Sequence, residues 1–144
     1  MSLKIVKKFN PTQVNFLFKL RNKKYVRNSS LSKKKINFVN HESWISKFRK
    51  NKKNRIYIIH KNNIKIGYIR IRKEKVYSNV SWAIEKKFQN KGIMSKELFK
   101  VTSRKSQKFK CLIKKNNFAS IKVANNAKFI FKMNLNKNLM YTKN

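Results

Sequence analysis

Apolar positions in the first third of the chain follow a strand period and then a helical one. A short apolar run at 3–9 predicts a strand, and Val14, Leu17 and Phe18 then recur at the spacing of one helix face. The Asn-Pro pair at 10–11 precedes that face, where Asn suits the N-cap and Pro the first helical position. The pattern predicts a strand, a helix and then a polar loop, 21–35, with room for a short helical turn.

A second helical face appears in the segment 41–50, after the polar loop. Trp44, Ile45 and Phe48 share one side of this segment, while charged and polar residues occupy the other side. Asn40 stands directly before it and is the expected N-cap, because its side chain can accept a hydrogen bond from the first helical turn. We therefore predict a second helix with one apolar face.

Three strand-like runs follow, rich in isoleucine, valine and tyrosine. They cover residues 55–61, 64–72 and 75–85. Asn62 and Asn63 separate the first two runs and suit a tight hairpin turn, because Asn tolerates positive φ. Lys73 and Glu74 are the expected turn between the second and third runs. Since such short turns join antiparallel neighbours, the three runs predict an antiparallel meander.

Helices and strands alternate in the last part of the chain. The pattern predicts a helix at 91–104, a strand at 109–115, a helix at 118–127 capped by Asn117, and strands at 129–134 and 138–142. The whole order predicts an α/β fold of the mixed α+β kind: a central mixed sheet, an antiparallel meander followed by crossover helices, and about four helices. With no linker or internal repeat, residues 1–144 are expected to form a single domain.

The charge balance of the chain points to anionic partners and leaves the predicted fold unchanged. Thirty-nine Lys and Arg residues face four acidic residues, all of them Glu, which gives a formal net charge of +35. Such a charge attracts anions and makes nucleic acid a candidate partner. A genome poor in G and C would also enrich lysine without a functional cause. Hydrophobic residues make up 40% of the chain, enough for a core, which excludes a disordered polycation.

Cysteine content and the length of apolar runs bear on disulfides, metal sites and membrane spans. Cys111 is alone in an apolar run, which predicts a buried reduced thiol and neither a disulfide nor a cysteine metal site. No apolar run approaches the roughly 18 residues of a membrane span, and the N-terminus has no long apolar core. We therefore expect a cytoplasmic protein with no membrane partner and no bound metal.

Gly92 is one of only two glycines and lies between a predicted strand and a predicted helix. The first N–H groups of a helix are unpaired and carry partial positive charge, which suits an anion such as a phosphate. Without a Cβ, Gly92 would let the backbone come close to such a ligand. A lone glycine here can also serve only to make a turn, so its spacing leaves both interpretations open.

The residues around this glycine resemble a known cofactor motif. The segment QNKGIM (89–94) is similar to the Gln/Arg-x-x-Gly-x-Gly/Ala motif of the GNAT acetyltransferases: Gln89 and Gly92 match, and Met94 replaces the last small residue. The family's Asn-x-x-Ser-Ile segment and the aromatic residue after it are matched by Asn117, Ser120, Ile121 and Phe129. The predicted element order agrees with the GNAT fold over nearly the whole chain.

The first half of the chain resembles a particular group of GNAT members. Arg21 and Asn22 end the first predicted helix, and His41 and Trp44 begin the second. These pairs resemble GNAT members that acetylate the amino group of nucleotide-linked deoxyamino sugars, although ribosomal-protein acetyltransferases share parts of the pattern. The resemblance implies that Arg21, Asn22 and Trp44 bind the acceptor, and the fork of donors on Arg21 would suit a nucleotide.

The resemblance also implies acetyl-CoA as the cosubstrate, with no metal. In the family, the fourth strand splays from its neighbour and its free backbone groups hold the pantetheine arm, while amides of the glycine loop hold the pyrophosphate. The residues implied to bind the cofactor are Trp82, Ala83, Ile84, Gln89, Asn90, Lys91, Gly92, Ile93, Met94, Ser95, Asn117 and Ser120. The amine attacks the thioester directly, and the protein contributes positioning and a backbone N–H for the oxyanion.

The catalytic half of the family pattern is less complete than the cofactor half. Ala124 stands where many members carry a Tyr that protonates the leaving thiolate, Lys128 replaces a helix-ending glycine, and Asn79 replaces an acidic residue. A base is still needed to make the amine neutral. The candidate bases are His41 and Glu42, and the candidate acid is Tyr141. For His41, a role as a helix-start residue is the alternative.

The motifs and the charge thus favour different functions. The leading prediction is an acetyl-CoA-dependent N-acetyltransferase that acts on a primary amine of an amino sugar, linked to a nucleotide. The alternatives are an N-acetyltransferase of ribosomal or basic proteins, and a GNAT fold that has lost turnover and binds nucleic acid. The glycine loop and the Asn-x-x-Ser-Ile segment favour the sugar enzyme, and the sequence leaves the oligomeric state open.

Overall fold

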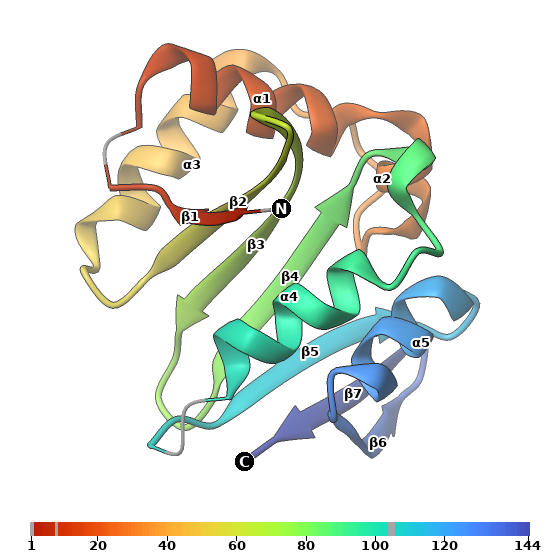
Figure 1. The fold of residues 1–144 in the computed structure, drawn as a ribbon. Coiled ribbons are helices and arrows are strands. Elements are labelled where there is room, and N and C mark those ends of the chain that lie inside the picture. The colour runs from red at the N-terminus through yellow and green to blue at the C-terminus, as the bar shows by residue number, and fades with distance from the viewer. Residues whose placement is uncertain (1, 8, 104–105) are drawn as a thin grey trace.

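Seven strands form one sheet in the order β1-β2-β3-β4-β5-β7-β6 in the computed structural model, which describes residues 2–7, 9–103 and 106–144 (Figure 1). The strands are β1 (Ser2–Ile5), β2 (Arg55–Lys61), β3 (Ile64–Lys73), β4 (Ser78–Ile84), β5 (Phe109–Lys114), β6 (Ile130–Leu135) and β7 (Asn138–Lys143). The helices are α1 (Pro11–Asn22), α2 (Lys24–Ser29), α3 (Phe38–Lys50), α4 (Ile93–Thr102) and α5 (Phe118–Asn126), with a 3-10 turn at Lys86–Phe88. The predicted mixed α/β fold is confirmed.

The described strands pair antiparallel everywhere except between β4 and β5. The strands β2 to β4 form the predicted meander, β1 adds antiparallel to β2, and β7 pairs antiparallel with both β5 and β6. Asn62 and Asn63 make the predicted hairpin turn with φ of 52° and 62°, in the left-handed region that Asn adopts more readily than most residues. The α4 helix is the crossover that the parallel β4–β5 pair requires.

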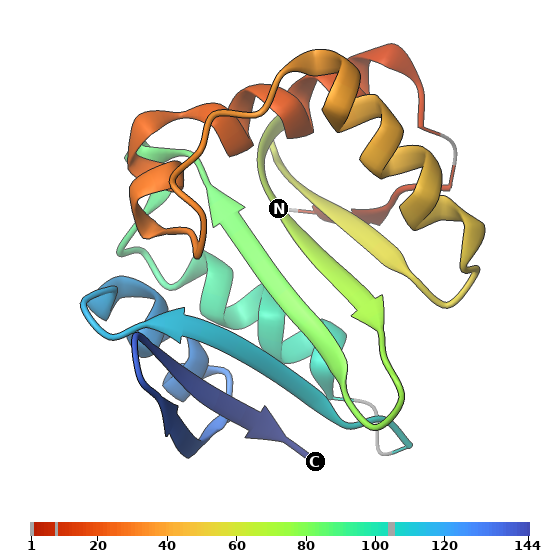
Figure 2. The same cartoon turned by 180° about the vertical axis from the view of Figure 1, so that it is seen from behind.

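Helices cover both faces of the sheet (Figures 1 and 2). The α1 and α3 helices lie on one face, where Leu20 and Phe48 belong to the same core as Ile58 of β2. The α4 and α5 helices lie on the other face, where Leu98 shares a core with Ile59. Ile58 and Ile59 are neighbours in β2 that point to opposite faces, because side chains alternate along a strand. One strand therefore contributes to both cores.

Two helix starts differ from the sequence prediction. The N-cap of α3 is Asn37, whose side chain accepts a hydrogen bond from Asn40 N at 2.8 Å, so Asn40 lies inside the helix and does not cap it. The α4 helix begins at Ile93 with Gly92 as its N-cap, whereas the prediction began at 91; the predicted end at 104 lies outside the described residues. Asn is a good cap at either position, so tertiary packing of α3 chose between them.

The first helical region also differs from its prediction. The buried face of α1 consists of Val14, Leu17 and Leu20, and the predicted core residue Phe18 is only half-buried. The polar stretch forms α2, so the described residues contain five α-helices where about four were predicted. This six-residue helix is too short to form alone and is held by tertiary contacts such as the burial of Val26.

β4 and β5 pair at only one end and diverge from there (Figure 2). Ser78 lies beside Phe109 and Asn79 beside Lys110, and no later residue of the described β4 pairs with β5. A sheet that opens in this way exposes unpaired N–H and C=O groups along the inner edge of β4. The divergence is the structural feature on which the site depends.

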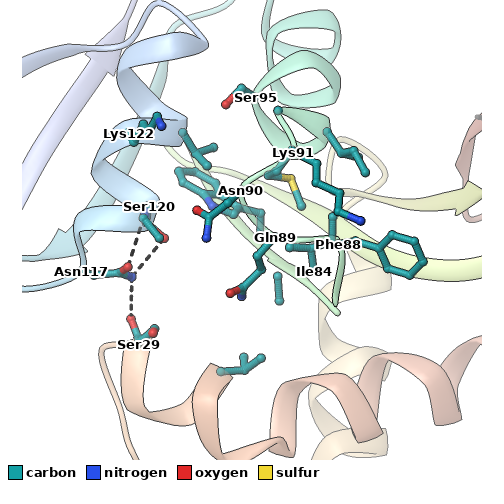
Figure 3. Close-up of a pocket in the computed structure, with 18 of the residues that line it drawn as sticks. Ser29, Ile84, Phe88, Gln89, Asn90, Lys91, Ser95, Asn117, Ser120 and Lys122 are labelled. Atoms are coloured by element: carbon teal, nitrogen blue, oxygen red, sulfur yellow. Dashed lines mark hydrogen bonds between the residues drawn. The ribbon is translucent and has the colours of Figure 1, made fainter. Parts of the chain in front are cut away.

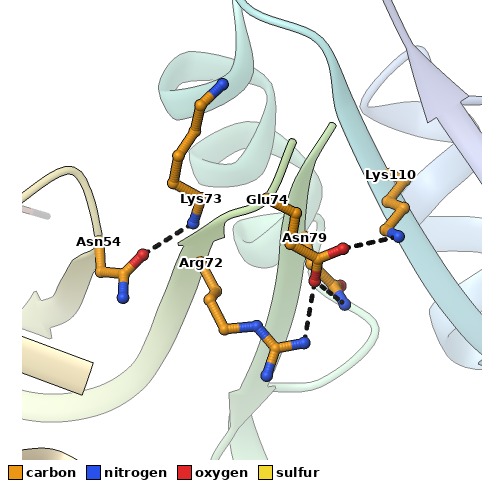
Figure 4. A network of polar contacts seen from close by, with 6 residues as sticks. All are labelled: Asn54, Arg72, Lys73, Glu74, Asn79 and Lys110. Carbon is orange, nitrogen blue, oxygen red and sulfur yellow. Dashed lines mark hydrogen bonds and ion pairs between the residues drawn. The ribbon is translucent and has the colours of Figure 1, made fainter. Parts of the chain in front are cut away.

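A polar network holds the closed end of this gap (Figure 4). The turn between β3 and β4 covers 74–77 rather than the predicted Lys73-Glu74 pair. Glu74 accepts from Arg72 at 2.9 Å and from Lys110 of β5 at 2.8 Å, and Asn79 approaches the same carboxylate at 3.4 Å. The position where the GNAT pattern often has an acid is therefore part of this network. One carboxylate thus ties the β3–β4 turn to β5.

We expect Glu74→Gln to lower the melting temperature by about 2–4 °C at pH 7, since a half-exposed ion pair contributes about 1 kcal/mol. Burial raises the pKa of Glu74, but hydrogen bonds from Lys110 and Arg72 outweigh it and hold the pKa below its ordinary value of 4.5. A carboxylate with a depressed pKa stabilises the fold above that ordinary value and loses the contribution as pH falls further.

In thermal melts, the difference between wild type and Glu74→Gln should therefore shrink as the pH falls below 4.5. Glu42→Gln is the matched control, because Glu42 is exposed and makes no ion pair with a described residue. Equal melting temperatures for wild type and Glu74→Gln at pH 7 would contradict the role given to the network.

Candidate active site

A cavity of about 410 Å³, here named the loop cavity, lies at the open end of the β4–β5 gap (Figure 3). Its walls come from the end of β4, the loop into α4, the start of α5, and α2. All twelve residues that the motifs assigned to the cofactor line this one cavity, from Trp82 on β4 to Ser120 on α5. Lys91 and Lys122 also line it and no acidic side chain does, so its field favours an anion.

The backbone of Trp82 is free on the side that faces the gap. Trp82 lies opposite Ile69 of β3, and three residues later the Glu85 N–H donates to Ile66 O at 2.8 Å, which marks Glu85 as a hydrogen-bonded position. Hydrogen-bonded positions alternate along an antiparallel ladder, so Trp82 directs its N–H and C=O away from β3 and toward β5. Because β5 no longer pairs there, this edge can bond with an extended ligand that carries amides.

Gly92 caps α4 in the left-handed conformation, with φ of 74°. Asn90, two residues earlier, also has a positive φ, of 60°. Successive N–H groups in such a turn point inward and bind anions together with the helix dipole. A Cβ added at Gly92 would meet no protein atom within 4 Å. The turn therefore requires this glycine for its φ, and the space beside it remains open for a ligand.

Asn117 caps α5 and positions Ser120 at the cavity wall (Figure 3). Its Oδ1 accepts from Ser120 N at 3.2 Å, and its Nδ2 donates to Ser120 Oγ at 3.0 Å and to Ser29 O at 3.2 Å. Because Ser120 Oγ accepts a hydrogen bond, its own hydroxyl proton is free to be donated. The Asn-x-x-Ser spacing thus gives both a helix cap and an oriented donor.

The α2 helix covers the loop cavity, and sequence reasoning did not assign it to the site. Tyr25 donates its hydroxyl to Ile84 O at 3.1 Å, and Lys23, the residue before α2, pairs with Glu85 at 2.6 Å. These two contacts hold the start of α2 against the end of β4. The α2 region contributes Tyr25, Val26, Ser29 and Ser30 to the lining. The surrounding sequence is polar and too short for a helical period, so the only available signal was the apolar Tyr-Val pair.

A second cavity of about 370 Å³, here named the basic cavity, lies on the α1–α3 face. Arg21, His41 and Trp44, which the sequence assigned to the acceptor or to catalysis, all line it. Tyr68 of β3 also lines it and is paired with Ala83 of β4, which lines the loop cavity. The two cavities therefore approach each other across this strand pair, as the sites of two co-reactants would.

His41 is buried in the wall of the basic cavity and is 4% exposed. Its ring stacks on Trp44 with a centroid separation of 6.4 Å, and its Nε2 is enclosed without a hydrogen-bond partner among the described residues. Burial lowers the pKa of His41, against the opposing effect of a hydrogen bond with the Val14 backbone. The imidazole is therefore neutral at pH 7. Its role as a base remains a prediction, and the enclosed Nε2 weakens it.

Three predicted site residues line neither cavity. Glu42 is exposed on α3, and Tyr141 is buried in β7, with its ring against Phe131 at 5.7 Å. Asn22 binds the backbone of Ile36 twice, donating to its carbonyl at 2.6 Å and accepting from its N–H at 2.9 Å. Asn22 thus holds the loop 31–37 against α1, and that loop forms one wall of the basic cavity.

The described residues give little support to a metal site, a cysteine nucleophile or a membrane span. They contain no group of three or more His, Cys, Asp or Glu side chains arranged to hold a metal. Burial raises the pKa of the Cys111 thiol to about 12, so it is a poor nucleophile at neutral pH. Among these same residues, every helix is too short or too polar to cross a membrane.

Comparison with known proteins connects this geometry to a family. A model of the acetyltransferase (GNAT) domain matches residues 5–130. The ribosomal L7/L12 alpha-N-protein acetyltransferase RimL, solved with coenzyme A, superposes with a TM-score of 0.77 at 18% identity, over 98% of this chain and 92% of that one. No curated protein sequence matches the chain with significance.

Two further structures have the same fold. The Campylobacter jejuni N-acetyltransferase PseH in complex with acetyl coenzyme A has a TM-score of 0.71 at 14% identity, covering 99% of this chain and 96% of that one. A Vibrio cholerae spermidine N-acetyltransferase has a TM-score of 0.77 at 11% identity, covering 97% and 92%. With its sheet, its open strand pair and a family match over most of its length, the chain belongs to the GNAT acetyltransferases.

Proposed function

We propose that this protein transfers the acetyl group of acetyl-CoA to the primary amine of a nucleotide-linked amino sugar, in the cytoplasm. The observation that carries the acetyl-CoA part is the loop cavity, in which a free strand edge leads to a left-handed loop at the start of α4. The N–H groups at 89–95 and Lys91 suit a pyrophosphate, and the edge at Trp82 suits the amides of a pantetheine arm.

The chemistry proposed for the open end of the gap is a direct transfer. The amine nitrogen attacks the thioester carbonyl, the carbon–sulfur bond breaks, the thiolate takes up a proton and the amine loses one. The Trp82 N–H is a suitable donor for the developing oxyanion. Ser120, whose proton is free, is a better candidate to protonate the thiolate than Tyr141, which lines neither cavity. The amine's own proton is proposed to leave through water, since His41 Nε2 is enclosed.

The acceptor is proposed from the basic cavity and from the sequence resemblance of its lining residues to amino-sugar acetyltransferases. Arg21, His41 and Trp44 reach this cavity from α1 and α3, as the resemblance to amino-sugar acetyltransferases implies. RimL and the spermidine enzyme share the fold at similar TM-scores, so fold alone does not select the acceptor. The cationic walls of the cavity support an acceptor with phosphate over a polyamine.

An acceptor panel tests this function. The protein would be incubated with acetyl-CoA and, separately, a UDP-linked amino sugar, an N-terminal peptide of a ribosomal protein, and spermidine. Thiol release and the product mass report transfer. Acetylation of the sugar nucleotide alone supports the proposal. Acetylation of only the peptide would support the ribosomal-protein alternative, and acetylation of spermidine would refute the assigned acceptor class.

The net charge of +35 favours one second candidate, a GNAT fold that binds nucleic acid. Fluorescence anisotropy with a short labelled RNA separates the two functions when it is repeated from low to physiological salt. We expect RNA binding to fade steeply with salt and acetyl-CoA binding to persist. Tight RNA binding at physiological salt with no acetyl transfer would favour the second candidate.

Asn22→Ala is expected to raise the KM for the acceptor by about fivefold to tenfold, because two backbone hydrogen bonds that hold a cavity wall are lost. The KM for acetyl-CoA should not change, since the loop cavity is built from other elements. Asn54→Ala is the matched control: Asn54 also makes two backbone hydrogen bonds, to Phe48 O and from Lys73 N, outside both cavities. Steady-state kinetics that show the same KM change in both variants would contradict the assignment.

A further inference from the structure

The basic cavity has cationic groups on several walls and no acidic one. Arg21 enters from α1, Lys34 and Lys35 from the loop before α3, and Arg70 from β3. The other lining residues are apolar, aromatic or neutral, with Trp44 and Tyr68 as the large aromatic surfaces. A cavity with this composition concentrates anions and repels cations.

Arg70 is the most unusual of these cations, because it is half-buried without an acidic partner. The chain has four acidic side chains. Glu74, Glu85 and Glu97 pair with other bases, and Glu42 is exposed and lines no part of this cavity. The described residues also accept no hydrogen bond from the Arg70 guanidinium. Residues outside the described ranges are Met, Lys and Arg, so none of them is acidic.

The surroundings of Arg70 raise the cost of its charge. Burial, followed by the nearby charges of Arg21 and Arg72, lowers the pKa of Arg70 to about 10, while Tyr68 opposes this effect. The guanidinium remains charged at pH 7. A charge that loses part of its solvent and has no counter-ion is unfavourable, and such groups are found often at functional sites.

One face of the guanidinium already has a contact. Its carbon lies 4.9 Å from the centre of the Trp44 ring, which is a cation–π geometry. Stacking holds the plane of the guanidinium and leaves its N–H edge without a described acceptor. A fixed plane with free donors along the edge is the arrangement that binds two oxygens of a phosphate at once.

We propose that Arg70, stacked on Trp44, is the specificity-determining residue of the basic cavity and recognises a phosphate or diphosphate group on the acceptor. The inference rests on the proposed function and deepens it: the acceptor carries its amine and its anionic group on one small molecule. Arg21 and the two lysines supply the surrounding positive field. Polyamine acceptors, which are cations throughout, are excluded by the same groups.

The test measures anion binding separately from acetyl-CoA binding. Calorimetry would follow UDP binding to full-length protein already saturated with coenzyme A, so that the loop cavity is occupied. UDP is chosen because it has a diphosphate but no adenine. Arg70→Gln is expected to weaken UDP binding by about tenfold or more, because charge-assisted hydrogen bonds are lost. Arg70→Lys should give an intermediate loss, since it keeps the charge without the fork.

Arg72→Gln is the matched control. It removes the same charge from the same strand, but Arg72 lies outside both cavities and pairs with Glu74. We expect less than a twofold change in UDP binding for it. Equal losses in Arg70→Gln and Arg72→Gln would indicate attraction to the overall charge and overturn the proposal, as would tight binding of spermine in place of UDP.

Thermal melts provide an independent readout. If Arg70 serves to bind a ligand, Arg70→Gln should keep or raise the melting temperature of the free protein, because a partly desolvated charge without an acidic partner is removed. A large drop would mean that Arg70 is a structural support for Trp44, and would overturn the proposal. Failure of wild-type protein to bind acetyl-CoA would refute the proposed function instead, whatever UDP does.

Discussion

Replacing Gly92 by Trp is expected to weaken acetyl-CoA binding by about 100-fold or more while the protein stays folded. The loss follows because a large side chain would fill the open space beside the loop, where several N–H groups are proposed to hold a pyrophosphate through charge-assisted hydrogen bonds. The fold should survive, because no protein atom lies within 4 Å of the added Cβ. The cost of a side chain at φ of 74° is about 1–2 kcal/mol.

Calorimetric titration with acetyl-CoA at moderate salt measures this loss, and the salt suppresses unspecific attraction to the positive surface. Asn136→Trp is the matched control, since Asn136 also has a positive φ, of 68°, in the turn between β6 and β7 and lines neither cavity. Its backbone strain is comparable, so it should lower stability similarly and leave binding intact. Saturable one-to-one binding by Gly92→Trp would refute the proposed phosphate loop.

The second large effect is expected at the other glycine. Gly67→Ala should destabilise the protein by about 1–3 kcal/mol, since an overpacked site must move its neighbours. A Cβ at Gly67 would lie 2.8 Å from Ala83 O and 3.3 Å from Ile84 Cα, both backbone atoms of β4. This pair of strands must separate or shift to admit a methyl group. Because Ala83 and Ile84 line the loop cavity, acetyl-CoA binding should weaken as well.

A thermal melt measures the stability loss, expected as a decrease of about 3–10 °C in melting temperature. Lys65→Ala, two residues earlier on β3, places the same side chain at a position that is only half-buried and should change little. An unchanged melting temperature for Gly67→Ala would contradict the close approach of β3 and β4. The two glycines thus serve different needs, φ at Gly92 and close packing at Gly67.

The residues that line the loop cavity could be grouped from the sequence because they form short local motifs, and their binding of acetyl-CoA stays a prediction. Gln89 and Gly92 lie on one loop, and Asn117 and Ser120 are one helical turn apart, so a local pattern contains their geometry. Elements with a strong period, such as the β2–β3 hairpin, were predicted for the same reason. A local signal cannot decide between two positions that it favours equally. Asn37 and Asn40 are equally good N-cap residues for α3, and the structure uses Asn37.

The acceptor half depended on contacts between distant segments. Asn22 and His41 appear as site residues in the sequence, but Asn22 is used by the backbone of Ile36 and the His41 Nε2 is enclosed. No sequence pattern singles out Arg70, because an arginine in a strand normally faces solvent. Only the packing of α3 over β3 places its guanidinium against Trp44 and in the wall of the basic cavity.

The sequence by itself determined the family, the order of the strands along the chain, and the place of the glycine turn before α4, because these depend on short-range periodicity and on residues whose backbone requirements are distinctive. The tertiary structure decided the rest. The divergence of β4 from β5, the cover provided by α2, and the stacking of an arginine without an acidic partner on Trp44 all arise from segments that are remote along the chain. Which charge loses part of its solvent depends on packing, and packing is a property of the folded chain.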